Sequence, residues 1–181
     1  MLYLRSAAGG NVFALARMGS ICQEIEEEGG PSSVSEPLLD EALRILEDLR
    51  PFEELPEILR ELLLRDDVVV TEPTAMACRF WLEASLSGNP LAQKSLADEI
   101  MMVEASSSSS GNPDQRLLAA VLFALASQQE TRGPSGSGFD SDDSSLSRVI
   151  EFDLAARDVR SQEEFLASPV VQTARAAFGG V

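Results

Sequence analysis

The stretch ACRFWLEASLSGNPLAQKSLADEI, residues 77–100, decides the fold, because an earlier part of the chain repeats its pattern. At an offset of 78 residues the first copy aligns with the second at Tyr3-Leu4 on Trp81-Leu82, Gly10-Asn11 on Gly88-Asn89, Ala14 on Ala92 and Met18 on Leu96. A helix, a Gly-Asn turn and a second helix, recurring along a chain, are typical of stacked helix pairs. We therefore predict an all-α fold, a right-handed α-solenoid fragment of antiparallel helix pairs.

A third and weaker copy lies further along the chain. Leu122–Ser127 aligns with Phe80–Ser85 at an offset of 42 residues, without the glycine and asparagine that follow in the other copies. In the first copy Tyr3 stands almost at the start of its helix, whereas Trp81 stands well inside its own. We expect a first repeat truncated at its N-terminus, with an apolar end that needs covering.

Turn signals and apolar spacing divide the chain into six segments. These are the first repeat (1–30), an inserted helical pair (31–70), the second repeat (71–105), a Ser-rich linker (106–112), a degenerate third repeat (113–160) with a disordered loop at 131–145, and a C-terminal helix (161–181).

Several residues are predicted to begin helices. Ser35, Thr71 and Asn112 are of the types that accept hydrogen bonds from the first free amides of a helix, and Pro73 and Pro113 suit a first turn. The β-prone run at 68–70 has no partner run in the chain and is interpreted as an extended connector.

Charge bears on the choice of partner. The chain has 30 acidic and 14 basic residues, a formal net charge of −16. This field repels phosphate backbones and anionic lipid, so we predict no nucleic-acid partner and a protein partner with a basic or neutral surface.

The longest apolar run, 117–126, is far shorter than the roughly 20 residues of a membrane helix, so no direct membrane insertion is expected. Without a secretory signal, the predicted location is cytoplasmic or otherwise intracellular.

The residue types present exclude much chemistry. The chain has no histidine, which removes histidine triads, proton shuttles and metal ligands, and it has no glycine-rich phosphate loop. We predict no enzyme activity and no catalytic, metal or cofactor-binding residue. Cys22 and Cys78 are expected to be small buried hydrophobes in a reducing compartment, while a disulfide between them stays an alternative.

The aligned copies resemble the Sel-one-like repeat, a relative of the tetratricopeptide repeat. The second copy fits that pattern at Ala77, Trp81, Leu82, Ala84, Gly88, Asn89, Ala92, Gln93 and Leu96, and the first fits at Tyr3, Leu4, Ala7, Ala8, Gly10, Asn11, Ala14, Met18 and Gly19. Ala97 stands where the family has glycine. The resemblance is clear for residues 3–22 and 75–104 and weak for 113–158.

Eight residues carry the repeat signature, and their predicted role is structural. They are Tyr3, Gly10, Ala14, Trp81, Ala84, Gly88, Ala92 and Leu96. The small ones are expected to let two helix backbones approach closely, while Trp81 or Tyr3 fills the gap to the neighbouring repeat. The alternative is a set of ordinary antiparallel helix pairs without common ancestry.

The resemblance implies a protein–protein interaction adaptor or scaffold module. Two alternatives stay open: a self-associating structural subunit, and a non-functional fragment of a longer repeat protein. Ser141 and Ser144, in an acidic segment, are candidate phosphorylation sites.

Overall fold

The computed structural model describes residues 2–32, 35–49, 55–63, 72–106, 112–130 and 166–179. Over these residues the secondary structure is helical and no strand occurs, so the all-α prediction is confirmed. The helices are α1 (Leu2–Ala8), α2 (Val12–Glu27), α3 (Glu36–Leu49), α4 (Glu57–Leu63), α5 (Pro73–Leu86), α6 (Pro90–Ser106), α7 (Pro113–Glu130) and α10 (Pro169–Phe178).

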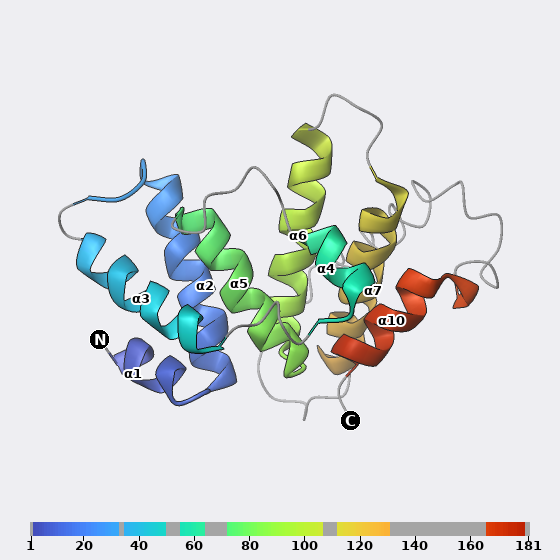
Figure 1. Cartoon of the computed structure of the whole chain (residues 1–181), viewed down its shortest axis with the longest axis horizontal. Helices are drawn as coiled ribbons and strands as arrows, with labels where there is room; N and C mark the ends of the chain where they lie inside the picture. The colour runs from blue at the N-terminus through green and yellow to red at the C-terminus, as the bar shows by residue number, and fades with distance from the viewer. Residues whose placement is uncertain are drawn as a thin grey trace.

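Four helices form a row through the molecule. Helix α2 packs along α5, α5 contacts α6, and α6 packs along α7 (Figure 1). The contacts of α2 with α5 and of α6 with α7 are the most extensive of the fold. Helix α1 contacts α2 at one end of the row.

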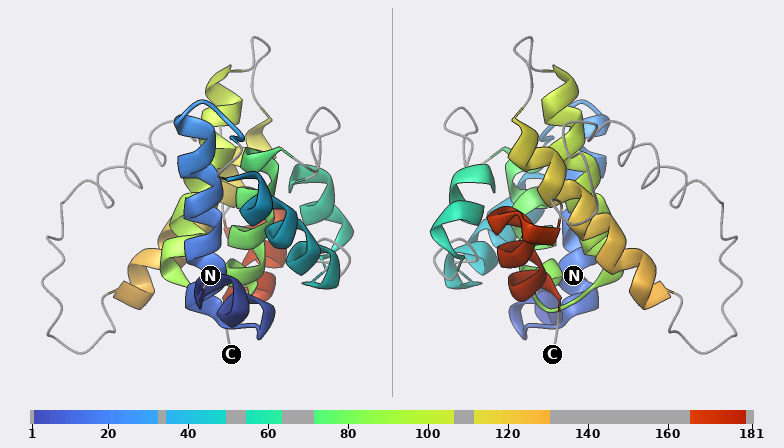
Figure 2. Two further views of the ribbon diagram at one scale, coloured as in Figure 1. Left: turned by 90° about the vertical axis from the view of Figure 1, so that its left-hand side faces the viewer. Right: turned by 90° about the vertical axis from the view of Figure 1, so that its right-hand side faces the viewer.

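The remaining helices cover this row. Helix α3 contacts α5 and α1, whereas α4 contacts α10, so the two helices of the inserted segment have different neighbours. Helix α10 also contacts α7 and α5. Figure 2 shows α3 and α4 on the same side of α2, α5 and α6.

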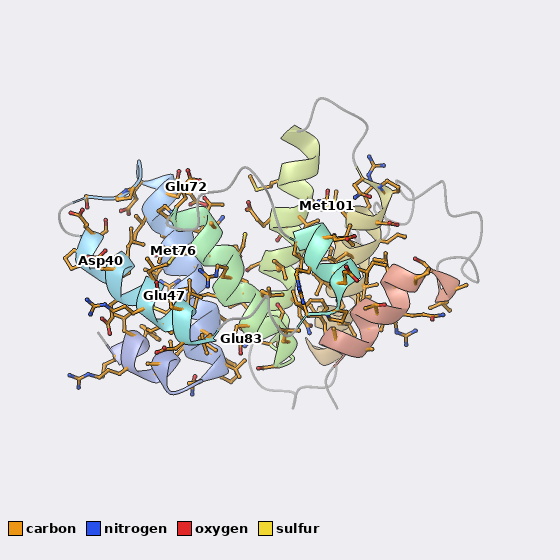
Figure 3. All side chains as sticks on the ribbon, in the orientation of Figure 1. Asp40, Glu47, Glu72, Met76, Glu83 and Met101 are labelled. Atoms are coloured by element: carbon orange, nitrogen blue, oxygen red, sulfur yellow. The ribbon has the colours of Figure 1, made fainter. Side chains whose placement is uncertain are left out.

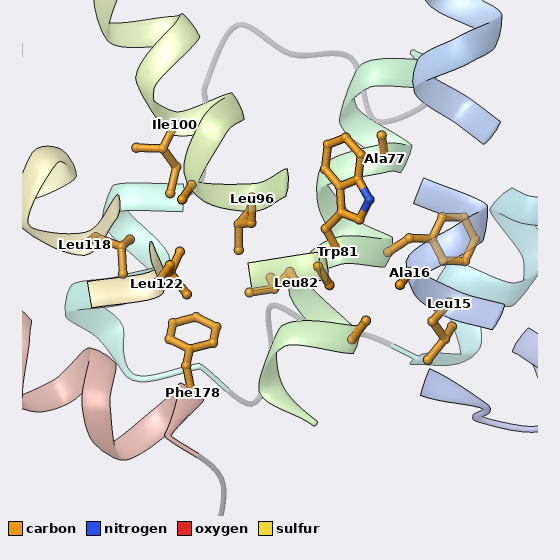
Figure 4. Close-up of a cluster of buried hydrophobic side chains, with 14 of the residues drawn as sticks. Leu15, Ala16, Ala77, Trp81, Leu82, Leu96, Ile100, Leu118, Leu122 and Phe178 are labelled. Atoms are coloured by element: carbon orange, nitrogen blue, oxygen red, sulfur yellow. The ribbon is translucent and has the colours of Figure 1, made fainter. Parts of the chain in front are cut away.

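The core runs along the row. Its largest fully buried side chains include Trp81, Phe80 and Phe178. Figure 4 shows Trp81 directed toward α2, while Phe178 of α10 faces Leu122 of α7. The apolar body of α7 lies between neighbours, with α6 and α10 packed against it.

Helix starts agree with the sequence in part. Helix α7 begins at Pro113, and the Asn112 Oδ1 accepts a hydrogen bond from the Asp114 amide at 3.0 Å, as predicted. Helix α5 begins at Pro73, but its N-cap is Glu72, whose side chain makes no capping hydrogen bond. The prediction that Thr71 caps this helix is therefore wrong, because the proline sets the first turn one residue later. Thr71 itself lies outside the described residues.

Other sequence predictions also fall outside the described residues. They concern the run at 68–70, the loop at 131–145 and the candidate phosphorylation sites Ser141 and Ser144. Within the predicted C-terminal helix, Pro169 is the first residue of α10, and Ser168 is its N-cap.

Candidate functional site

Two turns of the chain have the same conformation. Gly10 has a φ of 75° and Gly88 a φ of 79°, both in the left-handed region that favours glycine. The Gly10 amide donates to the Ala7 carbonyl at 2.8 Å, and the Gly88 amide donates to the Ser85 carbonyl at 2.9 Å. The 78-residue repeat is thus also a repeat of backbone geometry.

The asparagine after each glycine caps the following helix. The Asn11 Oδ1 accepts from the Ala14 amide at 3.0 Å, and the Asn89 Oδ1 accepts from the Ala92 amide at 2.9 Å. Each bond satisfies an amide that has no partner inside its helix. Two residues therefore set the start of α2 and of α6 in the same way.

The structure corrects the role expected of Gly10. A Cβ added there would meet nothing within 4 Å, so close approach of two helices does not require this glycine. The positive φ of Gly10 is what requires glycine at this position, because an L side chain in that conformation is strained.

Gly19 of α2 is where close approach occurs. A Cβ there would overlap the Trp81 indole, with the ring Nε1 nearest and Cδ1 only 2.5 Å away. The indole lies over this glycine and is almost fully buried, so Trp81 fills the gap between α2 and α5 as expected. Sequence alignment marked both residues as parts of the repeat but gave no sign that they touch.

Tyr3 differs from its counterpart Trp81. Its side chain is 52 % exposed, so the expectation that Tyr3 fills a gap between repeats is wrong for the structure described. Four other signature residues are buried: Ala14, Ala84, Ala92 and Leu96. Ala14 and Ala92 are thus buried at equivalent positions of the two helix pairs. Tyr3 and Trp81 also correspond in sequence, but Tyr3 is exposed and Trp81 is buried.

A buried polar group joins the second helix pair to α10. The Gln93 Nε2 donates to the Phe178 carbonyl at 3.0 Å and lies 3.4 Å from the Ser85 carbonyl. The Gln93 Oε1 and Ser85 Oγ are also buried, and neither has a hydrogen-bond partner among the residues described. This contact spans 85 residues of sequence.

An arginine attaches α3 to the row. The Arg79 Nη2 of α5 donates to the Leu46 carbonyl of α3 at 3.1 Å. Burial lowers the pKa of the Arg79 guanidinium, and the neighbouring Glu47 carboxylate acts in the opposite direction. Figure 3 shows Glu47 with the other labelled acids Asp40, Glu72 and Glu83 along α3 and the α5 segment. The contact is a structural tether between two helices.

Metal ligands and thiols were the remaining candidate reactive groups of the described residues. Within it, no three or more Cys, Asp or Glu side chains are grouped so as to hold a metal ion, and no helix is long and apolar enough to cross a membrane. Cys22 and Cys78 are not joined in a disulfide; Cys22 is buried, as expected, whereas Cys78 is only half-buried. Burial raises the pKa of the Cys22 thiol to about 12, so it stays protonated at neutral pH.

Comparison with known proteins adds no relative. No protein-family model, curated protein or solved structure matches this chain. The class of protein therefore rests on its own geometry, an all-helical fold with a repeated helix–turn–helix unit.

Proposed function

We propose that this protein is an interaction adaptor or scaffold module made of Sel-one-like helix pairs stacked as a right-handed α-solenoid fragment. The observation that carries the proposal is the repeated Gly-Asn turn together with the packing of α2 on α5. In such stacks the second helix of one pair packs on the first helix of the next. Helices α2 with α5, and α6 with α7, follow that order.

Stacked helix pairs present wide surfaces instead of a reaction centre. This architecture binds peptides or helices of other proteins on a face shared by several repeats. The net charge of −16 favours a partner with a basic or neutral surface and disfavours nucleic acid. Binding to a basic partner would weaken as salt is added, because screening shortens the reach of exposed charges.

Self-association is the second candidate, since large apolar side chains stand exposed at the α1–α2 end. They are Leu2, Tyr3 and Phe13. A closed homodimer would cover all three side chains.

The test begins with sedimentation mass and a helical melt of the purified chain. An adaptor gives a cooperative melt and a monomer, or a stoichiometric hetero-complex with a partner captured from cells and then prepared pure. A stable homodimer without a hetero-partner supports self-association. An uncooperative melt contradicts both and supports a fragment of a longer repeat protein.

A matched pair of variants ties binding to the stack. Gly19→Leu pushes α2 away from Trp81 and should abolish complex formation while leaving most helix content. Phe13→Leu changes an exposed side chain of the same helix and should bind as the parent does. Equal binding by Gly19→Leu and the parent would contradict a function that depends on stacked pairs.

A further inference from the structure

The outer face of α1, which we define by Leu2 and Tyr3, is exposed, whereas the corresponding residues of α5 are buried. Leu2 is 84 % and Tyr3 52 % exposed. At an offset of 78 residues they correspond to Phe80 and Trp81, which are 0 % and 2 % exposed. The turns and caps that follow these positions are the same, so the difference lies in what packs on the face.

The chain itself shows what covers such a face. On α5 the cover is α2, which brings Gly19 against the Trp81 ring. On α7 the corresponding residue is Phe123, 2 % exposed, and α6 packs along that helix. In both cases the helix before the covered one in the row packs along it.

The covering helices share one feature at positions that correspond at the 78-residue offset. Gly19 of α2 and its counterpart Ala97 of α6 are both small and buried. A small residue lets the covering helix come close enough for a ring to lie on its backbone, which a larger side chain would prevent. The covering helix is therefore defined chemically by an apolar face with a small, buried residue, which in α2 is Gly19 against the Trp81 ring.

We propose that the outer face of α1 binds a partner helix of this kind, with its glycine or alanine over Tyr3. This rests on the proposed function and names the surface and the partner that it would use. Charge is compatible with an apolar contact, because α1 (LYLRSAA) has no acidic residue in a chain of net charge −16. Binding would bury Leu2 and Tyr3, two large side chains that now face water.

The chain supplies a probe for this face. A synthetic peptide of residues 12–27 reproduces α2, the helix that packs along α5 with Gly19 against Trp81. A hydrocarbon staple between positions 17 and 24 would hold it helical, since Arg17 and Glu24 are exposed and joined by an ion pair at 2.8 Å. Isolated peptides of this length are otherwise marginal helices.

The experiment measures anisotropy of the fluorescein-labelled peptide with the full chain, under reducing conditions. The expected result is saturable binding that weakens about tenfold or more in Tyr3→Glu, the order of loss at a central interface residue. A peptide with Gly19→Leu should bind equally poorly. Phe13→Glu is the matched control, because Phe13 is 78 % exposed and its counterpart Leu91 stays 55 % exposed in the covered repeat.

The single tryptophan separates binding from exchange. The peptide has no tryptophan, so displacement of α2 by the peptide would change Trp81 emission, whereas docking on α1 would not. A change of emission on binding would overturn the proposal. So would absence of saturable binding, or equal binding by Tyr3→Glu or by the Gly19→Leu peptide.

These results are distinct from those that bear on the proposed function. If a stoichiometric partner forms its complex equally well with Tyr3→Glu, the adaptor function stands and the α1 face is not its site. If no partner forms a complex although the peptide binds, the face is as inferred and the adaptor function is wrong.

Discussion

Replacing Gly19 by alanine tests the contact between α2 and α5 directly. Glycine inside a helix is less favourable than alanine by about 1 kcal/mol, so the change should stabilise an isolated α2 by that amount. In the folded chain the new Cβ would overlap the Trp81 ring, whose Cδ1 lies 2.5 Å from it. Figure 4 shows the ring lying among Ala16 and Ala77, which leaves it little room to turn.

The two effects oppose each other, and the overlap should win. Overpacking a tight interior commonly costs about 1–3 kcal/mol, and here the neighbour is a rigid ring. We expect Gly19→Ala to lower the free energy of unfolding by about 1 kcal/mol after the helix gain is subtracted, or roughly 2–4 °C in Tm for a chain of this size.

A double-mutant cycle separates the overlap from the helix propensity. In a Trp81→Leu background the ring is absent, so Gly19→Ala should stabilise the chain by about 1 kcal/mol instead. The assay is urea unfolding followed by circular dichroism, which works in all four proteins. If Gly19→Ala stabilises both backgrounds equally, the ring does not lie on this glycine and the reasoning fails.

Three further predictions concern the caps, α10 and the buried thiol. Asn11→Ala and Asn89→Ala should each cost about 1 kcal/mol in urea unfolding, with serine at either position restoring most of it, because serine also accepts from the helix amide. Gln93→Leu should leave the Phe178 carbonyl without its donor and speed hydrogen exchange in α10 more than in α2; equal protection of α10 in mutant and parent would contradict this role. For Cys22, burial raises the pKa of the folded thiol to about 12, above its ordinary value of 9.0, so the unfolded thiol ionises first as pH rises. Stability should therefore be complete below pH 9 and fall above it by up to about 1.4 kcal/mol per pH unit, and Cys22→Ala should remove that part of the slope in urea titrations.

Local features were predictable because their causes are local. The Gly-Asn turns depend on a residue that tolerates positive φ and on a side chain three positions from the amide it caps. Asn112 is a related local case, because its Oδ1 accepts from the amide two positions on and α7 begins at Pro113 as expected. The prediction that Thr71 caps α5 failed, because Pro73 occupies the start of the first turn and Glu72 is therefore the N-cap.

Contacts between distant segments could not be predicted in this way. Nothing in the sequence near Gln93 indicates that it donates to a carbonyl 85 residues away, or that Arg79 holds the end of α3. Periodicity shows which face of a helix is apolar but not which helix covers it.

The sequence by itself determined that the described part of the chain is helical, where the two Gly-Asn turns lie, that two stretches share a pattern, and that the net charge is strongly negative. Only the tertiary structure decided that Gly19 receives Trp81 and that Tyr3, in the same place of the first copy, faces water. The physical reason is that a turn is set by the φ, ψ and hydrogen bonds of a few neighbouring residues. Burial instead depends on which other helix fills the space beside a side chain. Two similar stretches, one at the end of a row of helices and one in its middle, therefore have different neighbours.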